Sequence, residues 1–160
     1  MQEFLRPLPT LNLLRTFCYT QYTMNYINIW SVVVGAISSM VIGSIYYGPL
    51  FGKRYMDAIG MNEWSPEKRE RMTKNMGLTY GAQFIASMVT FYVLAGVIIW
   101  FDKTSAMGGA SAAFWMWLGF ILPVKIGDAL WGGTKELFWL GAGNTLVTML
   151  VGGAILGAMN

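Results

Sequence analysis

Long runs of apolar residues without a single Asp, Glu, Lys or Arg divide this chain. The four runs are residues 16–52, 75–101, 104–124 and 137–160. A helix of about 20 mainly apolar residues is long enough to cross a hydrocarbon core about 30 Å thick. A compact soluble fold can bury one such run, but four would leave it too little polar surface to face water.

The pattern therefore predicts an all-α fold, an integral membrane bundle of four transmembrane helices. We place the spans at about 27–47, 78–101, 110–131 and 137–158. The composition agrees, because 55% of the residues are hydrophobic and only 12% are charged, against about a quarter charged in soluble domains. The lipid bilayer is thus the first expected partner.

The composition also excludes much familiar chemistry. The chain has no histidine, which removes the usual general base and the commonest metal ligand. Cys18 is the single cysteine, so neither an intrachain disulfide nor a thiolate metal site can form. The net charge of +3 comes largely from one loop beside membrane spans, where topology explains it better than nucleic acid does. We therefore expect no enzyme, no metal, no cofactor and no nucleic acid.

The N-terminal tail, residues 1–26, differs from the rest in mixing Arg6 and Arg15 with prolines and scattered apolar residues. Three explanations compete for residues 1–23: a targeting segment, an upstream extension, or a tail lying on the membrane surface. Pro7 and Pro9 interrupt the place where a secretory signal would have its apolar core. We prefer the interfacial tail.

Small residues recur at four-residue spacing in three of the predicted spans. They are Ser31, Gly35, Ser39 and Gly43 in the first span, Gly77 and Gly81 at the start of the second, and Gly153 and Gly157 in the fourth. Membrane helices associate through close backbone approach at such positions, since lipid is as apolar as the helices themselves. We interpret these residues as helix-packing faces; the alternative is the general abundance of glycine and serine in such helices.

The stretch GSIYYGPLFGKRYM, residues 43–56, has the order expected where a helix leaves a bilayer. Tyr46 and Tyr47 suit headgroup depth, Pro49 is expected to end the helix, and Lys53 and Arg54 then stand outside the hydrocarbon. A charged amphipathic helix is predicted in the loop that follows, starting at Ser65, an N-cap residue, followed by proline.

The loop between the first two spans is rich in cations. They are Lys53, Arg54, Lys68, Arg69, Arg71 and Lys74. One interpretation is a docking site for lipid headgroups or a partner protein, and the other, which we prefer, is a solvated helix carrying topology signals. The positive-inside rule places the 53–75 loop in the cytoplasm or an equivalent compartment, with both termini on the opposite side.

Two ionisable groups and two amides fall within or near the spans. Lys125 and Asp128 lie three residues apart on one helical face, and Gln83 and Asn144 lie inside the second and fourth spans. Ionisable groups in a bilayer suggest a polar path for protons or ions. The alternative is a snorkelling ion pair near the interface, with the amides bonded to neighbouring helices; we prefer this alternative.

The stretch quoted above, together with WLGF at 117–120 and GGAILGAM at 152–159, resembles the domain-of-unknown-function 1761 family over about 25–160. Its members are small multi-pass membrane proteins, mostly bacterial but also eukaryotic. The resemblance implies a fold but no activity, because the family has no accepted one. The matching positions are Gly43, Tyr47, Pro49, Phe51, Gly52, Lys53, Gly119, Phe120, Gly153 and Gly157.

Three hypotheses for function remain. The first is a structural or accessory subunit that associates through its glycine-rich faces with itself or with a larger membrane complex. The second is a small transporter or channel subunit in which Lys125 and Asp128, with Gln83 and Asn144, line a polar path. An enzyme is the third and most distant. The first two differ in whether the ionisable pair faces an internal aqueous space or the membrane interface.

Overall fold

The structure of the chain is a computed structural model that describes residues 27–132 and 134–160. The predictions for the N-terminal tail, residues 1–26, lie outside the described residues. Within the described ranges every regular element is helical, as the charge-free runs predict.

Four long helical segments form the body of the molecule. They are α2 (Ile29–Ile45) continued by η2 (Tyr46–Leu50), α5 (Met76–Trp100), α6 (Ala106–Met116) continued by η4 (Trp117–Ile121) and α7 (Leu122–Trp131), and α8 (Lys135–Met159). They contain 22, 25, 26 and 25 residues. At 1.5 Å per residue the shortest is about 33 Å long, enough to cross a hydrocarbon core of about 30 Å. The predicted bundle of four apolar helices is thereby confirmed.

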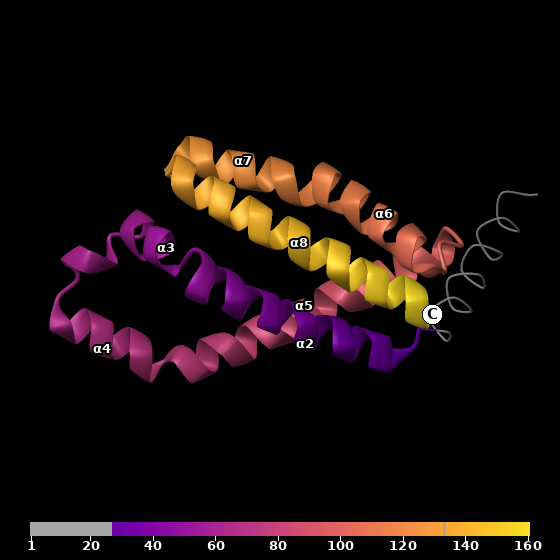
Figure 1. Ribbon diagram of the computed structural model, residues 1–160, viewed down its shortest axis with the longest axis horizontal. Coiled ribbons are helices and arrows are strands. Elements are labelled where there is room, and N and C mark those ends of the chain that lie inside the picture. Colours follow the sequence, from indigo (N-terminus) through magenta and orange to yellow (C-terminus); the bar gives the residue numbers. More distant parts are fainter. Residues whose placement is uncertain (1–26, 133) are drawn as a thin grey trace, which may run out of the picture.

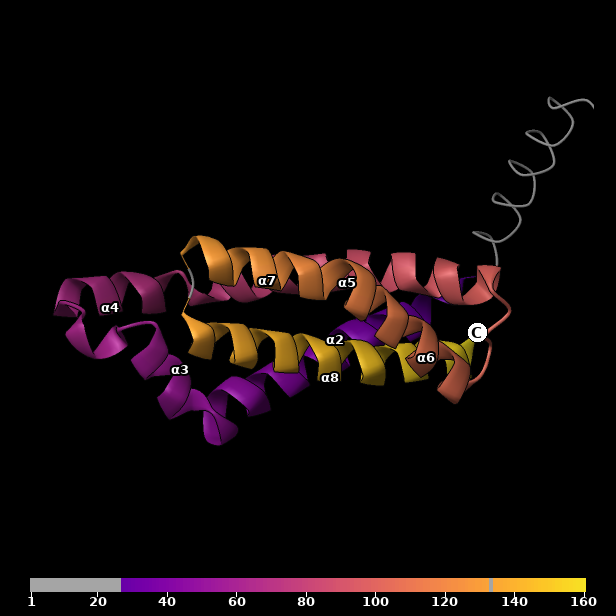
Figure 2. The same ribbon diagram turned by 90° about the horizontal axis from the view of Figure 1, so that it is seen from above.

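Short helices join the first long segment to the second: α3 (Gly52–Ala58), η3 (Met61–Glu63) and α4 (Pro66–Lys74). The predicted start of α4 is confirmed, because the Ser65 hydroxyl accepts a hydrogen bond from the backbone N–H of Lys68 at 3.3 Å. No residue of α4 is buried. Figure 2 shows the long helices along one axis with α3 and α4 at one end. We call this the loop end, and the opposite end, where α2 starts and α8 stops, the far end.

Helix α8 is central and packs against α6, α2 and α5 (Figure 1). The buried apolar core is Val32, Ala36, Phe91, Leu94, Ala95, Ile98, Ala113, Trp117, Ala142, Met149 and Leu156. Most of these residues belong to the far-end half of their helices. Polar groups join α2 to α8 there: the Asn28 backbone N–H donates to Asn160 Oδ1 at 2.7 Å, and Asn160 Nδ2 donates to Ser31 Oγ at 2.8 Å.

Toward the loop end, α5 separates from the other helices. Every residue of α5 from Met76 to Ala86 is exposed except Phe84, which is partly buried. Likewise α2 and η2 contain no buried residue beyond Ser39. Figure 1 shows α2 and α5 crossing and then diverging toward α3 and α4. The bundle is therefore closely packed at the far end and open at the loop end.

Prolines in the first and third long segments produce π-turns instead of helix ends. The first segment was expected to end near Tyr47, but it continues through Pro49 to Leu50, and the Phe51 N–H bonds the carbonyl of Tyr46 five residues back at 2.9 Å. Because a proline ring clashes with the carbonyl four residues before it, a widened turn relieves the clash without ending the helix. The turn before Pro123, η4, has the same form.

Candidate helix contacts and polar groups

Glycines bring α6 and α8 into backbone contact at the far end. A Cβ added to Gly153 would lie 2.6 Å from the carbonyl oxygen of Gly109, and one added to Gly157 would lie 2.9 Å from the Gly109 Cα. Distances this short mean that no side chain fits between the helices. Sequence reasoning named Gly153 and Gly157 but missed Gly109, which lies just before the predicted start of the third span at about residue 110. The four-residue spacing of Gly109 and Ala113, which is also buried, was the available signal.

The small residues of the first span divide into a packed group and an open position. Ser31, Gly35 and Ser39 are buried. Gly35 faces the ring of Phe91, with 3.3 Å between an added Cβ and the ring atom Cγ. The Ser39 and Ser87 hydroxyls hydrogen-bond at 3.1 Å, joining α2 to α5. Beyond this crossing, nothing lies within 4 Å of a Cβ added to Gly43.

Phe91 fills the space between three helices, which sequence reasoning did not detect. Its ring is 1% exposed, and it lies against Gly35 of α2 and Gly152 of α8. A Cβ on Gly152 would overlap the ring, so glycine is required for this approach. The contact fixes the depth at which α5 meets α8.

Gly77 and Gly81 are open to the surroundings. Nothing lies within 4 Å of an added Cβ at either position, and both residues are exposed. Gln83, in the same segment of α5, is also exposed, and its side chain makes no hydrogen bond to any residue that the structure describes. The predicted packing residues thus lie in two different settings, one enclosed at the far end and one open at the loop end.

Lys125 and Asp128 lie together on α7, near the loop end. Lys125 Nζ is 4.0 Å from Asp128 Oδ2, and their side chains are 36% and 66% exposed. The lysine side chain also extends across α8, where Nζ would lie 4.0 Å from a Cβ added to Gly141. The ammonium group therefore lies beside α8 at Gly141, at an ordinary van der Waals distance.

Asn144 and Thr148, one turn apart on α8, have covered oxygens. Asn144 Oδ1 and Thr148 Oγ1 are inaccessible to solvent and have no hydrogen-bond partner among residues 27–132 and 134–160. Sequence reasoning named Asn144 but not Thr148. A mid-span threonine is ordinary by sequence, and only the missing partner distinguishes this one.

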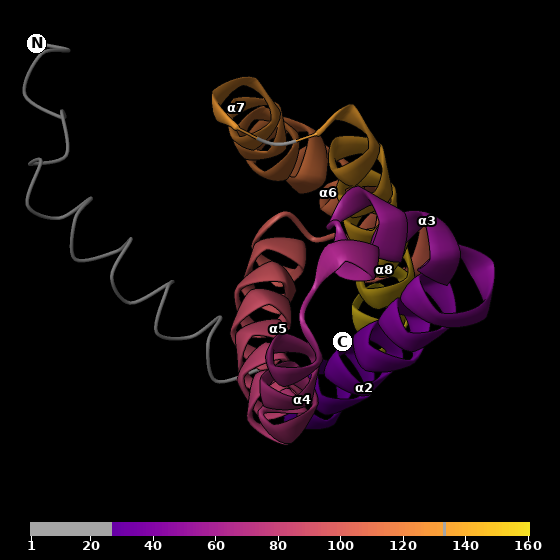
Figure 3. The same ribbon diagram turned by 90° about the vertical axis from the view of Figure 1, so that its left-hand side faces the viewer.

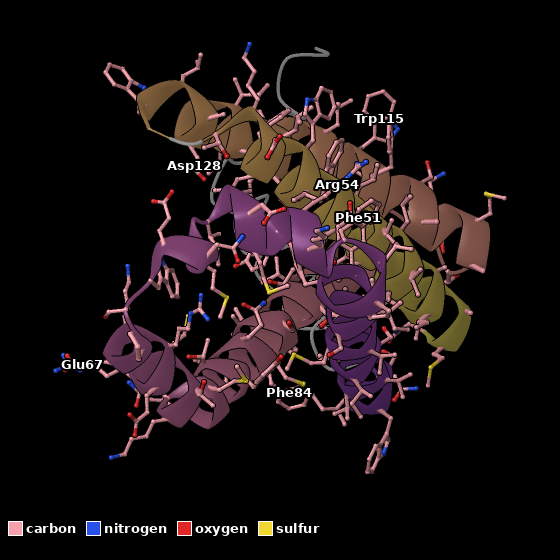
Figure 4. All side chains as sticks on the ribbon, turned by 60° about the vertical axis from the view of Figure 1, so that its left-hand side comes forward. Phe51, Arg54, Glu67, Phe84, Trp115 and Asp128 are labelled. Atoms are coloured by element: carbon pink, nitrogen blue, oxygen red, sulfur yellow. The ribbon has the colours of Figure 1, made fainter. Side chains whose placement is uncertain are left out.

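All six loop cations are exposed on α3 and α4 at the loop end. Two of them already have partners: Arg69 Nη2 donates to the Met61 carbonyl at 2.9 Å, and Lys68 Nζ lies 4.3 Å from the centre of the Trp64 ring. These contacts hold α4 against the turn before it. Figure 4 shows Glu67 pointing away from the molecule, so both signs of charge face outward here.

These features define a small polytopic membrane protein whose far end is joined by glycine contacts and whose loop end is open. Among known families, the sequence profile described as "Protein of unknown function (DUF1761)" matches residues 30–157. The chain belongs to the DUF1761 family, which confirms the resemblance carried by its boundary motifs. No curated protein and no solved structure matches it.

Proposed function

We propose that this chain is a non-enzymatic structural or accessory subunit, and that the loop-end half of α5 packs against a transmembrane helix of another chain. That helix belongs to a second copy or to a larger membrane complex. The observation that carries the proposal is the exposure of α5 from Met76 to Ala86 on all sides, with Phe84 the one partly buried residue.

The chemistry of this segment favours a helix as its occupant over lipid alone. Gly77 and Gly81 remove side chains from successive turns, and the resulting groove lets a second backbone approach closely. The Gln83 amide, two residues beyond Gly81, lies on another face of α5, where it can donate to and accept from a neighbouring helix; interhelical hydrogen bonds of this kind contribute about 0.6–2 kcal/mol in membranes. A lipid tail can fill a groove but cannot bond an amide.

The small transporter or channel subunit remains the second candidate, and it is supported by Asn144, whose covered oxygen has no partner among the described residues. Lys125 extends toward α8, the helix that carries Asn144, whereas Gln83 is on the exposed segment of α5. The four residues of the suggested path therefore do not form one group, which favours association over transport.

The association is tested by the mass of the intact assembly extracted in lipid nanodiscs. The wild-type protein should give a mass above that of one chain, and Gly81→Leu should shift the population toward the single chain by filling the groove. Gly127→Leu is the matched control, since an added Cβ at Gly127 also has nothing within 4 Å, but on α7. A wild-type protein that is a lone chain, or equal behaviour of the two variants, would contradict the proposal.

A further inference from the structure

The six cations of the loop between α2 and α5 fall into two groups. Lys68 Nζ lies 4.3 Å from the centre of the Trp64 ring. Arg69 Nη2 donates to the carbonyls of Met61 and Asn62 at 2.9 and 3.3 Å. The side chains of the other four are exposed and have no hydrogen bond or ion pair to any residue that the structure describes. We call these four the boundary cations: Lys53, Arg54, Arg71 and Lys74.

Each boundary cation lies next to the apolar end of a long helix. Lys53 and Arg54 come three and four residues after the first long segment ends, and Lys74 comes two residues before α5 begins. Arg71 lies three residues earlier than Lys74, about 4.5 Å along the helix. The headgroup layer of a bilayer is about 5–8 Å thick on each side of the hydrocarbon. All four side chains are therefore within reach of lipid phosphates.

Helix α4 extends α5 beyond its apolar residues. The Asn75 N–H donates to the Arg71 carbonyl at 3.2 Å, and the Thr79 N–H donates to the Asn75 carbonyl at 3.1 Å, so helical hydrogen bonding continues across the junction. Residues earlier in α4 consequently lie farther from the apolar residues of α5. Glu67 is in the first turn and points away from the molecule (Figure 4), whereas Arg71 and Lys74 are in the last turn. These two cations are thus nearer the bilayer than Glu67.

The two boundary cations of α3 are held in place by packing. The Tyr55 ring of α3 lies against the Tyr47 ring of η2, with 4.8 Å between their centres. Seen from the loop end, α3 lies beside α8 and α4 lies over α5 (Figure 3). Asp57, the acid of α3, accepts a hydrogen bond from Asn62 Nδ2 at 2.7 Å. The boundary cations therefore occupy two fixed places on the rim of the bundle.

We propose that the boundary cations bind the phosphate groups of anionic phospholipids in the leaflet at the loop end. Basic clusters beside a membrane helix attract such lipids, by about fivefold for each cation near the surface. The depth of the cations favours lipid over a soluble acidic partner, which would first meet the outer part of α4, where Glu67 is exposed. The sequence alone favoured a solvated helix, because it does not separate the engaged cations from the boundary cations.

Electron spin resonance of spin-labelled lipids tests the proposal, with the full chain reconstituted in phosphatidylcholine vesicles. The protein should prefer labelled phosphatidylserine to labelled phosphatidylcholine several-fold, and salt should weaken this preference by screening. Arg71→Gln with Lys74→Gln should lower the preference at least twofold. Lys68→Gln with Arg69→Gln is the matched control, since it removes the same charge from the same helix and should have a smaller effect. Equal losses, or a wild-type protein without preference, would overturn the proposal.

A charge-conserving variant separates lipid binding from the total charge of the loop. Glu70→Lys combined with Lys74→Glu keeps the number of loop cations but moves one of them about 6 Å away from the apolar residues of α5. The preference for phosphatidylserine should fall, because an acid then lies at the boundary. An unchanged preference would mean that only the total charge matters, and would contradict the proposal. The readout is lipid contact, so it is distinguishable from dissociation of an assembly by Gly81→Leu.

Discussion

Replacing Gly153 with alanine should force α6 away from α8 and destabilise the bundle by about 3 kcal/mol, the upper part of the usual cost of overpacking. The added methyl group would lie 2.5 Å from the Ala113 Cβ and 2.6 Å from the Gly109 carbonyl oxygen. Backbone and Cβ atoms cannot rotate aside as a long side chain can. The two helices must separate, and the dispersion contacts along their whole interface weaken together.

The matched substitution for Gly153→Ala is Gly43→Ala. Nothing lies within 4 Å of the new methyl group at Gly43, so the stability should stay the same or rise slightly, as alanine is the better helix former. Reversible unfolding of both variants in bicelles, followed by circular dichroism, measures the difference. If Gly153→Ala were as stable as Gly43→Ala, the close contact between α6 and α8 would be disproved.

The fold could be predicted from the sequence because its signals are local. The length of each charge-free run sets how many helices can cross a bilayer, and a serine before a proline starts α4 at Ser65 without reference to distant residues. The boundaries were less accurate. Pro49 was expected to stop the first helix, but a π-turn accommodates its ring and the helical segment continues to Leu50.

The candidate site could be predicted only in part, because identical patterns have different neighbours. Gly153 and Gly81 both belong to four-residue glycine spacings, yet one touches a second backbone and the other touches nothing within 4 Å. Four-residue glycine spacing identifies a helix face that is able to pack closely. Whether a second helix lies against that face depends on the path of the helix, and at Gly81 α5 has diverged from the bundle. Gly109 was missed for the same reason. Its role exists only because α8 presents glycines opposite to it.

Thr148 shows why a buried polar group without a hydrogen-bond partner could not be predicted from the sequence. Its residue type and position resemble those of Thr145, three residues earlier, and neither sequence nor spacing separates them. In the folded chain Thr145 reaches both a backbone carbonyl and the Trp117 indole, while Thr148 reaches neither. A missing partner is a property of the assembled helices, so it could not be read from the sequence.

Phe91→Ala should lower the free energy of unfolding by about 3 kcal/mol, at the lower end of the usual 3–5 kcal/mol for such truncations. We expect a cost at the lower end because helices that separate in a bilayer remain in an apolar solvent. The substitution therefore removes mainly packing contacts. The ring is 1% exposed, and its removal leaves Gly35 and Gly152 facing an empty space at the centre of three helices. Phe101→Ala, which truncates a side chain that is 66% exposed, should change stability little.

A double-mutant cycle with Gly152→Ala separates this contact from a general loss of packing. Gly152→Ala alone should destabilise, because its methyl group overlaps the Phe91 ring. In the Phe91→Ala background the same methyl group enters the vacated space, and its cost should vanish or change sign. Contacting residues typically show coupling of about 0.5–3 kcal/mol. Additive effects of the two substitutions would mean that the ring does not lie on Gly152, and α5 would then meet α8 at another depth.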